Sequence, residues 1–403
     1  MRRKPHRVVV MLGALLLWGS AWLGSGWSAS PDEGKSPPEK AKSQAVSGEA
    51  LVKERCVMCH PLGRVRSARH TAGGWQATVE TMKLFGLQVT DPEAAAIVSY
   101  LRSAFPALAE DVSRARLYIP NEHDSTVSVV NTGSQAVVKT LTGVPRPHAL
   151  CRSPDGRFVY VSNHSESGGV QVIDTLIDGV VARIPTGAFP MHCAFSSEGR
   201  YVFVASHATN AVQIIDGIAR EVIATLPVGQ APHNLVVSPD GRSVWVSNVG
   251  SSDVSVIDRA TLKLTATVAV GKAPLGLAMS PDGMRVYTGN TGSGDVSVID
   301  AAALRVIATV PVGRGVNQVK VSLDGASLWV ALGAERAVAV MDLASHRIGV
   351  RIPVGEGPHG IAFAPDGKHA YVTNSDGDDV SVIDVVELKV IQTVHVGKAP
   401  ACL

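Results

Sequence analysis

From about residue 115 onward, short runs of alternating apolar and polar residues return at a regular spacing. Seven copies of one run are present: VSVVN (127–131), VQVID (170–174), VQIID (212–216), VSVID (254–258), VSVID (296–300), VAVMD (338–342) and VSVID (380–384). Six copies end in Asp, and successive aspartates are 42 residues apart: Asp174, Asp216, Asp258, Asp300, Asp342 and Asp384. Alternating β-branched residues between turn residues are typical of strands, so the pattern predicts repeated strand units over residues 115–403.

A turn sequence keeps step with these runs. Its copies are SPDGR (153–157), SSEGR (196–200), SPDGR (238–242), SPDGM (280–284), SLDGA (322–326) and APDGK (364–368). Each unit therefore reads as four antiparallel strands, which make one propeller blade. The aspartates of the turns are interpreted as structural turn residues (Asp155, Asp240, Asp282, Asp324 and Asp366), and the Asp174 series as turn caps.

The repeat resembles the YVTN family of β-propellers, and the run YVTN itself stands at residues 371–374. Seven units imply a seven-bladed propeller. The first unit begins at RLYIPN (116–121) with no turn sequence before it, whereas GKAPACL (397–403) repeats only the start of an inner strand. We therefore expect the C-terminal residues to enter the first blade and close the ring, which removes open sheet edges.

Residues 48–110 show a helical period instead. SGEALVKERC (47–56) predicts a short helix with Ser47 as N-cap, and GGWQATVETMKLFG (73–86) places Trp75, Val79 and Met82 on one helical face. DPEAAAIVSYLRSAF (91–105) predicts a third helix with Asp91 as cap and Pro92 in the first helical position. The segment is therefore predicted to be a small all-α domain.

Between the first two predicted helices, ERCVMCHPL (54–62) contains C-x-x-C-H, the attachment sequence of a c-type haem. Cys56 and Cys59 would bind the porphyrin covalently, and His60 would be the proximal iron ligand. A zinc site needs further ligands, and this segment has no second cysteine pair. The segment resembles class I cytochromes c, including the closing IVSYL helix, which implies one covalent haem c.

The sixth iron ligand has three candidates. Met58 lies inside the attachment loop and cannot cross the haem, and His70 lies in the basic stretch RVRSARHT. Met82 is the prediction, because a thioether would raise the reduction potential as in other His/Met cytochromes. The alternative for Met82 is a core residue that packs against the haem edge.

The N-terminus has the pattern of an export signal. A basic start (Arg2, Arg3, Lys4 and Arg7) precedes an apolar run over 8–22, so residues 1–30 are predicted to be a signal peptide or an uncleaved N-terminal anchor. Residues 31–47 are interpreted as a flexible linker. These features predict a periplasmic protein that is membrane-attached only if the anchor stays uncleaved. The net charge of +2 argues against a nucleic-acid partner.

Histidines are the candidate chemistry of the propeller. The residue after the one that opens each inner strand is His148, Met191, His233, Leu275, Asn317, His359 or Ala401, and His192 is one place further on. His164 and His207 end the second strands, with His123 nearby. His148, His192 and His233 are the candidate second site, because converging neutral imidazoles bind metals or haem iron. The alternative is structural histidines.

Three cysteines lie on predicted inner strands. Cys402 is placed beside Cys151 by the expected ring closure, so a disulfide between them and a buried free thiol are both open. Cys193 lies on the next inner strand.

The predicted fold is a small all-α cytochrome c domain followed by an all-β seven-bladed propeller. The layout is similar to cd1-type nitrite reductases, whose propellers have eight blades and hold haem d1. We expect an exported c-type cytochrome whose propeller carries a second redox or metal site (copper, another metal or haem d1) or docks a redox partner protein. If it is an enzyme, it is a periplasmic oxidoreductase. The alternative is a non-catalytic electron carrier, and a structural module is the third hypothesis.

Overall fold

The computed structural model describes residues 47–55, 75–76, 79–80, 82–83, 87–104 and 116–403. The predicted signal or anchor (1–30), all but the last residue of the linker (31–47), and the haem-attachment residues Cys56, Cys59 and His60 lie outside the described residues. Among the helices that the structure does describe, none combines the length and apolar character that a membrane crossing requires.

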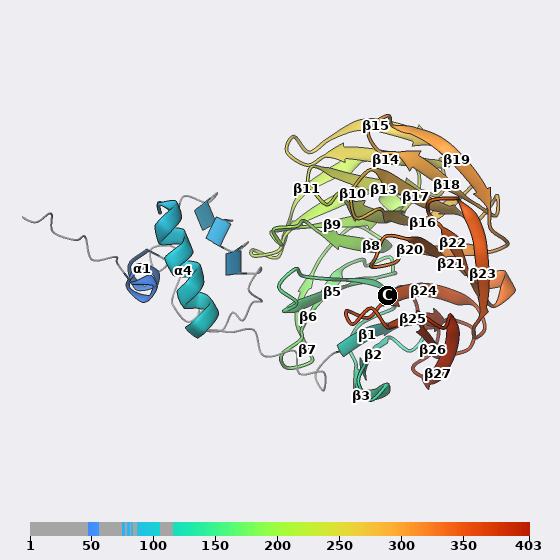
Figure 1. Cartoon of the computed structure of the whole chain (residues 1–403), viewed down its shortest axis with the longest axis horizontal. Coiled ribbons are helices and arrows are strands. Elements are labelled where there is room, and N and C mark those ends of the chain that lie inside the picture. Colours follow the sequence, from blue (N-terminus) through green and yellow to red (C-terminus); the bar gives the residue numbers. More distant parts are fainter. Residues whose placement is uncertain (1–46, 56–74, 77–78, 81, 84–86, 105–115) are drawn as a thin grey trace, which may run out of the picture. The chain divides into compact units, whose positions relative to one another are not determined.

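The described N-terminal part is helical, as the pattern predicted. Helices α1 (Gly48–Arg55) and α4 (Asp91–Ala104) pack against each other, and Ser47 caps α1 by accepting a hydrogen bond from the Ala50 N–H at 3.3 Å (Figure 1). Their shared core consists of Leu51, Val52, Trp75, Val79, Ala94, Ile97, Val98 and Leu101. A Cβ at Gly48 would lie 2.1 Å from the Ala96 carbonyl oxygen, so only glycine permits this approach of the two helices.

The predicted cap of α4 is wrong by one residue. Thr90 is the N-cap: its backbone N–H and its hydroxyl both donate to Glu93 Oε2, at 2.7 and 2.9 Å, and its hydroxyl accepts from the Glu93 N–H at 3.4 Å. This is a capping box, in which Thr and the Glu three residues later satisfy backbone groups that the helix start leaves free. Asp91 is therefore the first helical residue rather than the cap.

Residues 116–403 form seven antiparallel sheets that follow one another around a ring, which confirms the seven-bladed propeller (Figure 1). Blade 1 contributes three strands: β1 (Arg116–Asn121), β2 (Thr126–Asn131) and β3 (Ala136–Leu141). The other six blades have four strands each, of which the first is the inner strand.

Blade 2 consists of β4 (Pro147–Arg152), β5 (Phe158–Asn163), β6 (Val170–Asp174) and β7 (Gly179–Ile184). Blade 3 consists of β8 (Pro190–Phe195), β9 (Tyr201–Ser206), β10 (Ala211–Asp216) and β11 (Glu221–Pro227). Blade 4 consists of β12 (Pro232–Val237), β13 (Ser243–Asn248), β14 (Asp253–Asp258) and β15 (Lys263–Ala269).

Blade 5 consists of β16 (Pro274–Met279), β17 (Arg285–Asn290), β18 (Asp295–Asp300) and β19 (Arg305–Pro311). Blade 6 consists of β20 (Val316–Val321), β21 (Ser327–Leu332), β22 (Ala337–Asp342) and β23 (Arg347–Pro353). Blade 7 consists of β24 (Pro358–Phe363), β25 (His369–Asn374), β26 (Asp379–Asp384) and β27 (Lys389–His395). Inner strands of successive blades from 2 to 7 contact one another.

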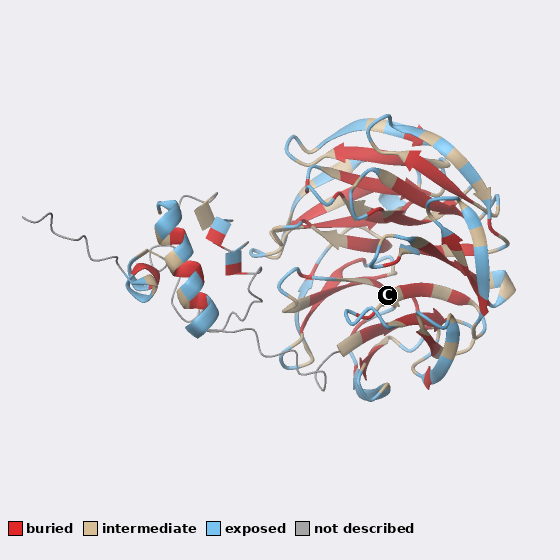
Figure 2. Cartoon of the chain, in the orientation of Figure 1, coloured by how far each residue is buried: buried red, intermediate tan, exposed pale blue. Residues whose placement is uncertain are grey.

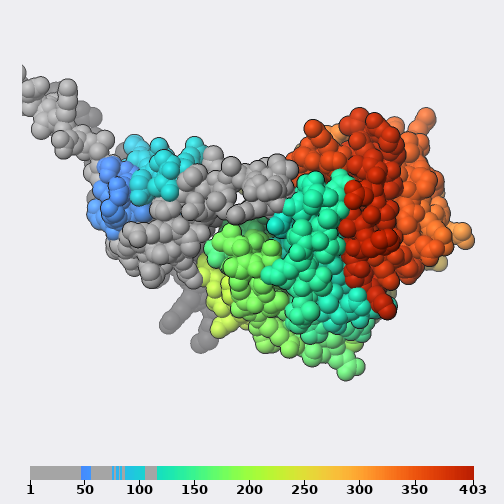
Figure 3. All heavy atoms as spheres, turned by 90° about the horizontal axis from the view of Figure 1, so that it is seen from below, coloured from blue at the N-terminus to red at the C-terminus, as the bar shows by residue number. Residues whose placement is uncertain are grey.

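The C-terminal residues 400–403, here called the closing segment, take the place of the missing inner strand of blade 1. Pro400 forms an antiparallel bridge with Asn121, and the Ala401 N–H donates to the Pro120 carbonyl at 2.8 Å. On its other side, the Cys402 N–H donates to the His148 carbonyl at 2.9 Å. The space-filling view shows the red C-terminal part lying against the teal first blade (Figure 3). The predicted ring closure is confirmed.

The core of the propeller lies between the blades. Inner, second and third strands are mostly buried, whereas the fourth strands alternate and are largely exposed (Figure 2). The predicted turn aspartates are confirmed as structural: Asp155 Oδ1 accepts from the Ser153 hydroxyl at 2.5 Å, and Asp216 Oδ1 accepts from two backbone N–H groups at 2.9 Å each.

Candidate metal centre

A backbone hydrogen bond that recurs in all seven blades fixes one end of the inner strands. In each blade, the residue before the inner strand, or before the closing segment in blade 1, has a positive φ. Its carbonyl accepts a hydrogen bond from the backbone N–H of the residue that follows the strand paired with that inner strand or closing segment. These pairs are Ala399–Glu122, Arg146–His164, Phe189–His207, Ala231–Val249, Ala273–Thr291, Gly315–Gly333 and Gly357–Ser375. The first residues of the inner strands are thereby held next to the ends of the second strands.

Four histidines and one thiol meet at this end, and we call them the histidine cluster: His148, His192, His233, His359 and Cys402. His148, His233 and His359 occupy the second position of β4, β12 and β24, and His192 occupies the third position of β8. In each of these strands the pairing register shifts just after the opening proline. This bulge allows residues at the second and third positions to approach the same space.

His148 lies at the centre of the cluster. Its ring centroid is 5.9 Å from that of His192, 5.8 Å from that of His233 and 5.8 Å from that of His359. The His192 and His233 rings are 5.1 Å apart. Side chains from blades 2, 3, 4 and 7 therefore contact one another across the ring.

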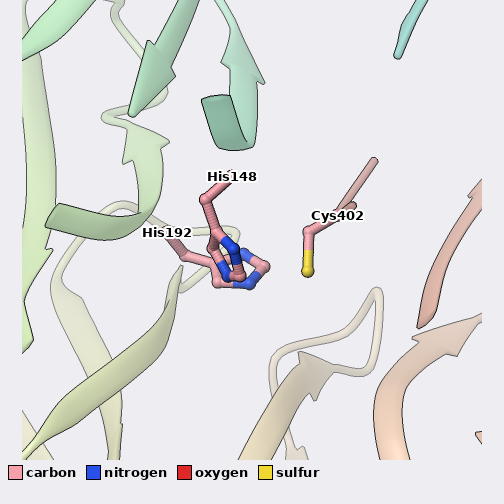
Figure 4. A group of neighbouring side chains, drawn as sticks. All are labelled: His148, His192 and Cys402. Carbon is pink, nitrogen blue, oxygen red and sulfur yellow. The ribbon is translucent and has the colours of Figure 1, made fainter. Parts of the chain in front are cut away.

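Cys402 brings sulfur to the same place. Its Sγ is 3.4 Å from His359 Nδ1, and one ligand atom each from His148, His192 and Cys402 lie within 4.8 Å of one another (Figure 4). Among the cysteines that the structure describes, Cys402 is the one free thiol, and it is buried. Burial raises its pKa, so the thiol is neutral unless a cation displaces its proton.

Glu122 orients the cluster from the end of β1. Its carboxylate accepts from His148 Nδ1 at 3.0 Å, from His164 Nδ1 at 2.9 Å and from Arg146 Nη2 at 2.8 Å. Burial by itself raises the pKa of Glu122, but these hydrogen bonds outweigh it and hold the pKa well below its ordinary range. The ionised carboxylate therefore places a proton on His148 Nδ1, so Nε2 is the ring nitrogen that remains for another partner.

Three ring nitrogens of the cluster have no hydrogen-bond partner among the described residues: His148 Nε2, His192 Nε2 and His233 Nδ1. Each of these side chains belongs to a residue that is only 6% exposed. Buried polar atoms without partners are costly in native structures, so each needs a physical reason. A bound cation at the centre of the cluster is such a reason.

Three of the cluster imidazoles, those of His192, His233 and His359, are held in the neutral form that binds metals. Burial, followed by the neighbouring histidines, lowers the pKa of His192 and His233 well below the ordinary value. Burial, with His148 as the second cause, lowers the pKa of His359 to about 4. Lys320 on β20 adds positive charge that lowers the pKa of His192 further.

The structure brings together the three predicted residues His148, His192 and His233. His164 also joins them through its ring contact with His148, at a centroid distance of 5.1 Å, whereas His123 is exposed. The sequence interpretation missed Glu122, His359 and Cys402 as site residues. Their positions in the repeat were a usable signal, because Glu122 matches His164 and His207, and ring closure brings blade 7 next to blade 1.

The Cys402–Cys151 disulfide, one of the two alternatives left open by the sequence, is not formed. Cys151 on β4 is bonded to Cys193 on β8, with a Cα–Cα distance of 5.6 Å, and Cys402 is free. Cys402 is the third residue of the closing segment, whereas Cys151 is the fifth residue of β4. The two thiols therefore lie at different depths along adjacent strands. The alternative of a buried free thiol is the correct one.

Met82 lies in the helical part, away from these histidines in sequence. It is half-buried, and its carbonyl accepts from the Leu87 N–H at 2.9 Å. Its predicted role as the sixth haem ligand stays a prediction, because the attachment residues lie outside the described part of the chain.

Three protein families match parts of the chain. The model of the cytochrome D1 heme domain matches residues 203–322, and that of the seven-bladed lactonase propeller matches residues 123–226. The haem-binding model of the quinohemoprotein amine dehydrogenase A alpha subunit matches residues 46–152. A search of curated proteins finds no match.

Solved structures share the fold at low identity. Hydrazine synthase of Kuenenia stuttgartiensis is 21% identical with a TM-score of 0.60, and the match covers 65% of this chain and 90% of that one. The periplasmic gluconolactonase PpgL of Pseudomonas aeruginosa is 22% identical with a TM-score of 0.62, covering 71% and 97%. Dihydro-heme d1 dehydrogenase NirN in complex with DHE is 18% identical with a TM-score of 0.54, covering 86% and 87%. Residues 116–403 thus form a seven-bladed propeller, and parts of the chain match two haem-related family models and one lactonase model.

Proposed function

We propose that the protein is an exported c-type cytochrome that transfers single electrons through one covalent haem and carries a second redox centre in its propeller. The observation that carries the proposal is the histidine cluster, where buried imidazoles and a thiol converge and three ring nitrogens have no partner in the described structure. The same chain contains the haem-attachment sequence at Cys56, Cys59 and His60.

Two observations support the covalent haem. The matched haem-binding family model spans residues 46–152, which include the attachment sequence. Helix α1 ends at Arg55, immediately before Cys56, and it packs on α4 around a common core. A small helical unit of this kind, with His60 and Met82 as the proposed axial ligands, would hold a haem whose iron exchanges one electron.

The disulfide supports export. Cys151 and Cys193 form a disulfide. Disulfides persist in oxidising compartments such as the periplasm and are rare in the cytosol. We accordingly propose a periplasmic location, with membrane attachment only if residues 1–30 remain uncleaved, and a periplasmic redox protein as partner.

The geometry of the cluster favours a single ion over a macrocycle between the rings. The imidazole centroids are 5.1 to 5.9 Å apart, and a tetrapyrrole is much wider than these gaps. A metal ion fits between donors at such spacings after small rotamer adjustments, since metal–nitrogen bonds are about 2 Å long. We therefore favour a metal over haem d1 as the second cofactor.

The haem is tested by expressing the full chain with a haem-attachment system and recording reduced-minus-oxidised spectra. We expect one c-type haem per chain. A Cys56→Ala/Cys59→Ala double variant should lose the covalent haem, and Met82→Ala should keep it but change its ligation and lower its potential. Met58→Ala is the matched control and should behave as the wild type. A wild-type protein without covalent haem would refute the proposed function.

A further inference from the structure

We propose that the histidine cluster is a mononuclear copper site with His148 Nε2, His192 Nε2 and Cys402 Sγ as ligands. This inference deepens the proposed function, on which it rests only for the choice of a redox-active metal. The geometry that carries it is the approach of three donor atoms from three blades to within 4.8 Å of one another (Figure 4).

The donor atoms point to a ligand rather than to a packed core. His148 and His192 are each 6% exposed, and their Nε2 atoms lack hydrogen-bond partners in the described part of the chain. Cys402 is 2% exposed, and its sulfur lies 3.4 Å from His359 Nδ1. A cation bound by these atoms would satisfy both nitrogens at once.

Glu122 acts as a positioning residue for this site. Its carboxylate accepts from His148 Nδ1 at 3.0 Å, which fixes the ring and leaves Nε2 free to coordinate. Metal-bound histidines usually donate their other N–H to such a partner. Arg146 and His164 hold the same carboxylate in place at 2.8 and 2.9 Å.

The donor set selects the class of metal. Two imidazoles and one thiolate suit soft or borderline transition metals, and a trigonal His₂Cys set is the arrangement of electron-transfer copper sites. The thiolate and the Glu122 carboxylate together supply two negative charges. These offset the positive charges of the ion, of the nearby Arg146 and of Lys320. His233 and His359 flank the site, each with its ring centroid 5.8 Å from that of His148.

The test uses the full haem-loaded chain, stripped of metal and then titrated with Cu²⁺ alone. We expect one tightly bound copper per chain, with one copper–sulfur distance in X-ray absorption at the copper edge, a readout that the haem does not obscure. Cys402→Ser should lose the sulfur signal. Glu122→Gln should weaken copper binding by about 10- to 100-fold while it keeps the sulfur ligand.

His395→Gln is the matched control, because His395 is exposed on the outer strand β27. It should bind copper as the wild type does. Circular dichroism and retention of the Cys151–Cys193 disulfide verify that each variant is folded. Copper binding without sulfur, equal binding by Cys402→Ser and His395→Gln, or zinc in place of copper in protein purified from the periplasm would overturn the proposal.

The two proposals fail separately. Absence of a covalent haem refutes the cytochrome function but leaves the copper–sulfur readout intact. A normal haem spectrum without copper binding refutes the copper site and leaves electron transfer through the covalent haem standing.

Discussion

Glu122 and the cluster histidines show how single residues acquire chemistry from their neighbours. Histidines of the same repeat type have different environments: His148, His192 and His233 are buried, whereas His123 is exposed. The His192, His233 and His359 rings stay neutral because the low-dielectric interior disfavours a charged imidazole. A neutral ring is a ligand, but it makes the folded protein sensitive to acid.

At the residue scale, we predict that the metal-free propeller loses stability as pH falls. The pKa values of His192, His233 and His359 are lowered in the folded state, so below about pH 6.5 the unfolded chain binds more protons than the folded one. The free energy of unfolding should therefore fall between about pH 6.5 and 4, by up to about 1.4 kcal/mol per pH unit for each histidine.

Urea unfolding at pH 7.5 and pH 5 measures this effect. His359→Gln should reduce the difference between the two pH values, because one titrating ring is removed. An equal difference in the variant and the wild type would mean that the buried histidines do not determine the acid sensitivity.

Strands decide which residues can meet. The disulfide joins β4 to β8, the inner strands of blades 2 and 3, and both strands carry cluster histidines. It therefore cross-links the two elements that position His148 and His192. At the same scale, the positive-φ residue before each inner strand sets where the strand begins.

At the element scale, we predict that a Cys151→Ala/Cys193→Ala variant is less stable by about 4 kcal/mol, because the bond closes a separation of 42 residues in the unfolded chain. Urea unfolding of both proteins measures the difference. A thiol reductant should destabilise the wild type by a similar amount and leave the variant unchanged; a reductant effect on the variant would contradict this origin.

The whole propeller depends on the closing segment, which joins blade 1 to blade 2. Ala401 and Cys402 donate backbone hydrogen bonds on opposite sides of the segment, to Pro120 and His148. Closure of the ring protects the inner edge of blade 1 and also delivers the Cys402 thiol to the cluster. Ring stability and the candidate metal site are therefore linked.

At the scale of the molecule, we predict that Ala401→Pro opens the ring. Proline removes the N–H that donates to Pro120, so we expect a loss of about 3 kcal/mol or more and a lower melting temperature. Ala401→Gly keeps the N–H and is the control. Equal melting temperatures for the two variants would show that this bond does not hold the ring closed.

The sequence by itself determined the propeller and its closure. Strands and turns are local patterns, so the 42-residue period and the unpaired RLYIPN unit were sufficient to count blades and to place the C-terminal residues. It also placed His148, His192 and His233 at equivalent ends of inner strands. The helices of the N-terminal part were predicted for the same local reason, apart from the Thr90–Glu93 capping box.

Only the tertiary structure decided the composition of the cluster. His359 and Cys402 come from blade 7 and the closing segment, which become neighbours of His148 only once the ring is closed, and Glu122 reaches His148 from the adjacent blade 1. The choice of Cys193 over Cys402 as the partner of Cys151 depends on depth along adjacent strands. Depth and adjacency are set by the packing of whole blades, and no local pattern in the chain encodes them.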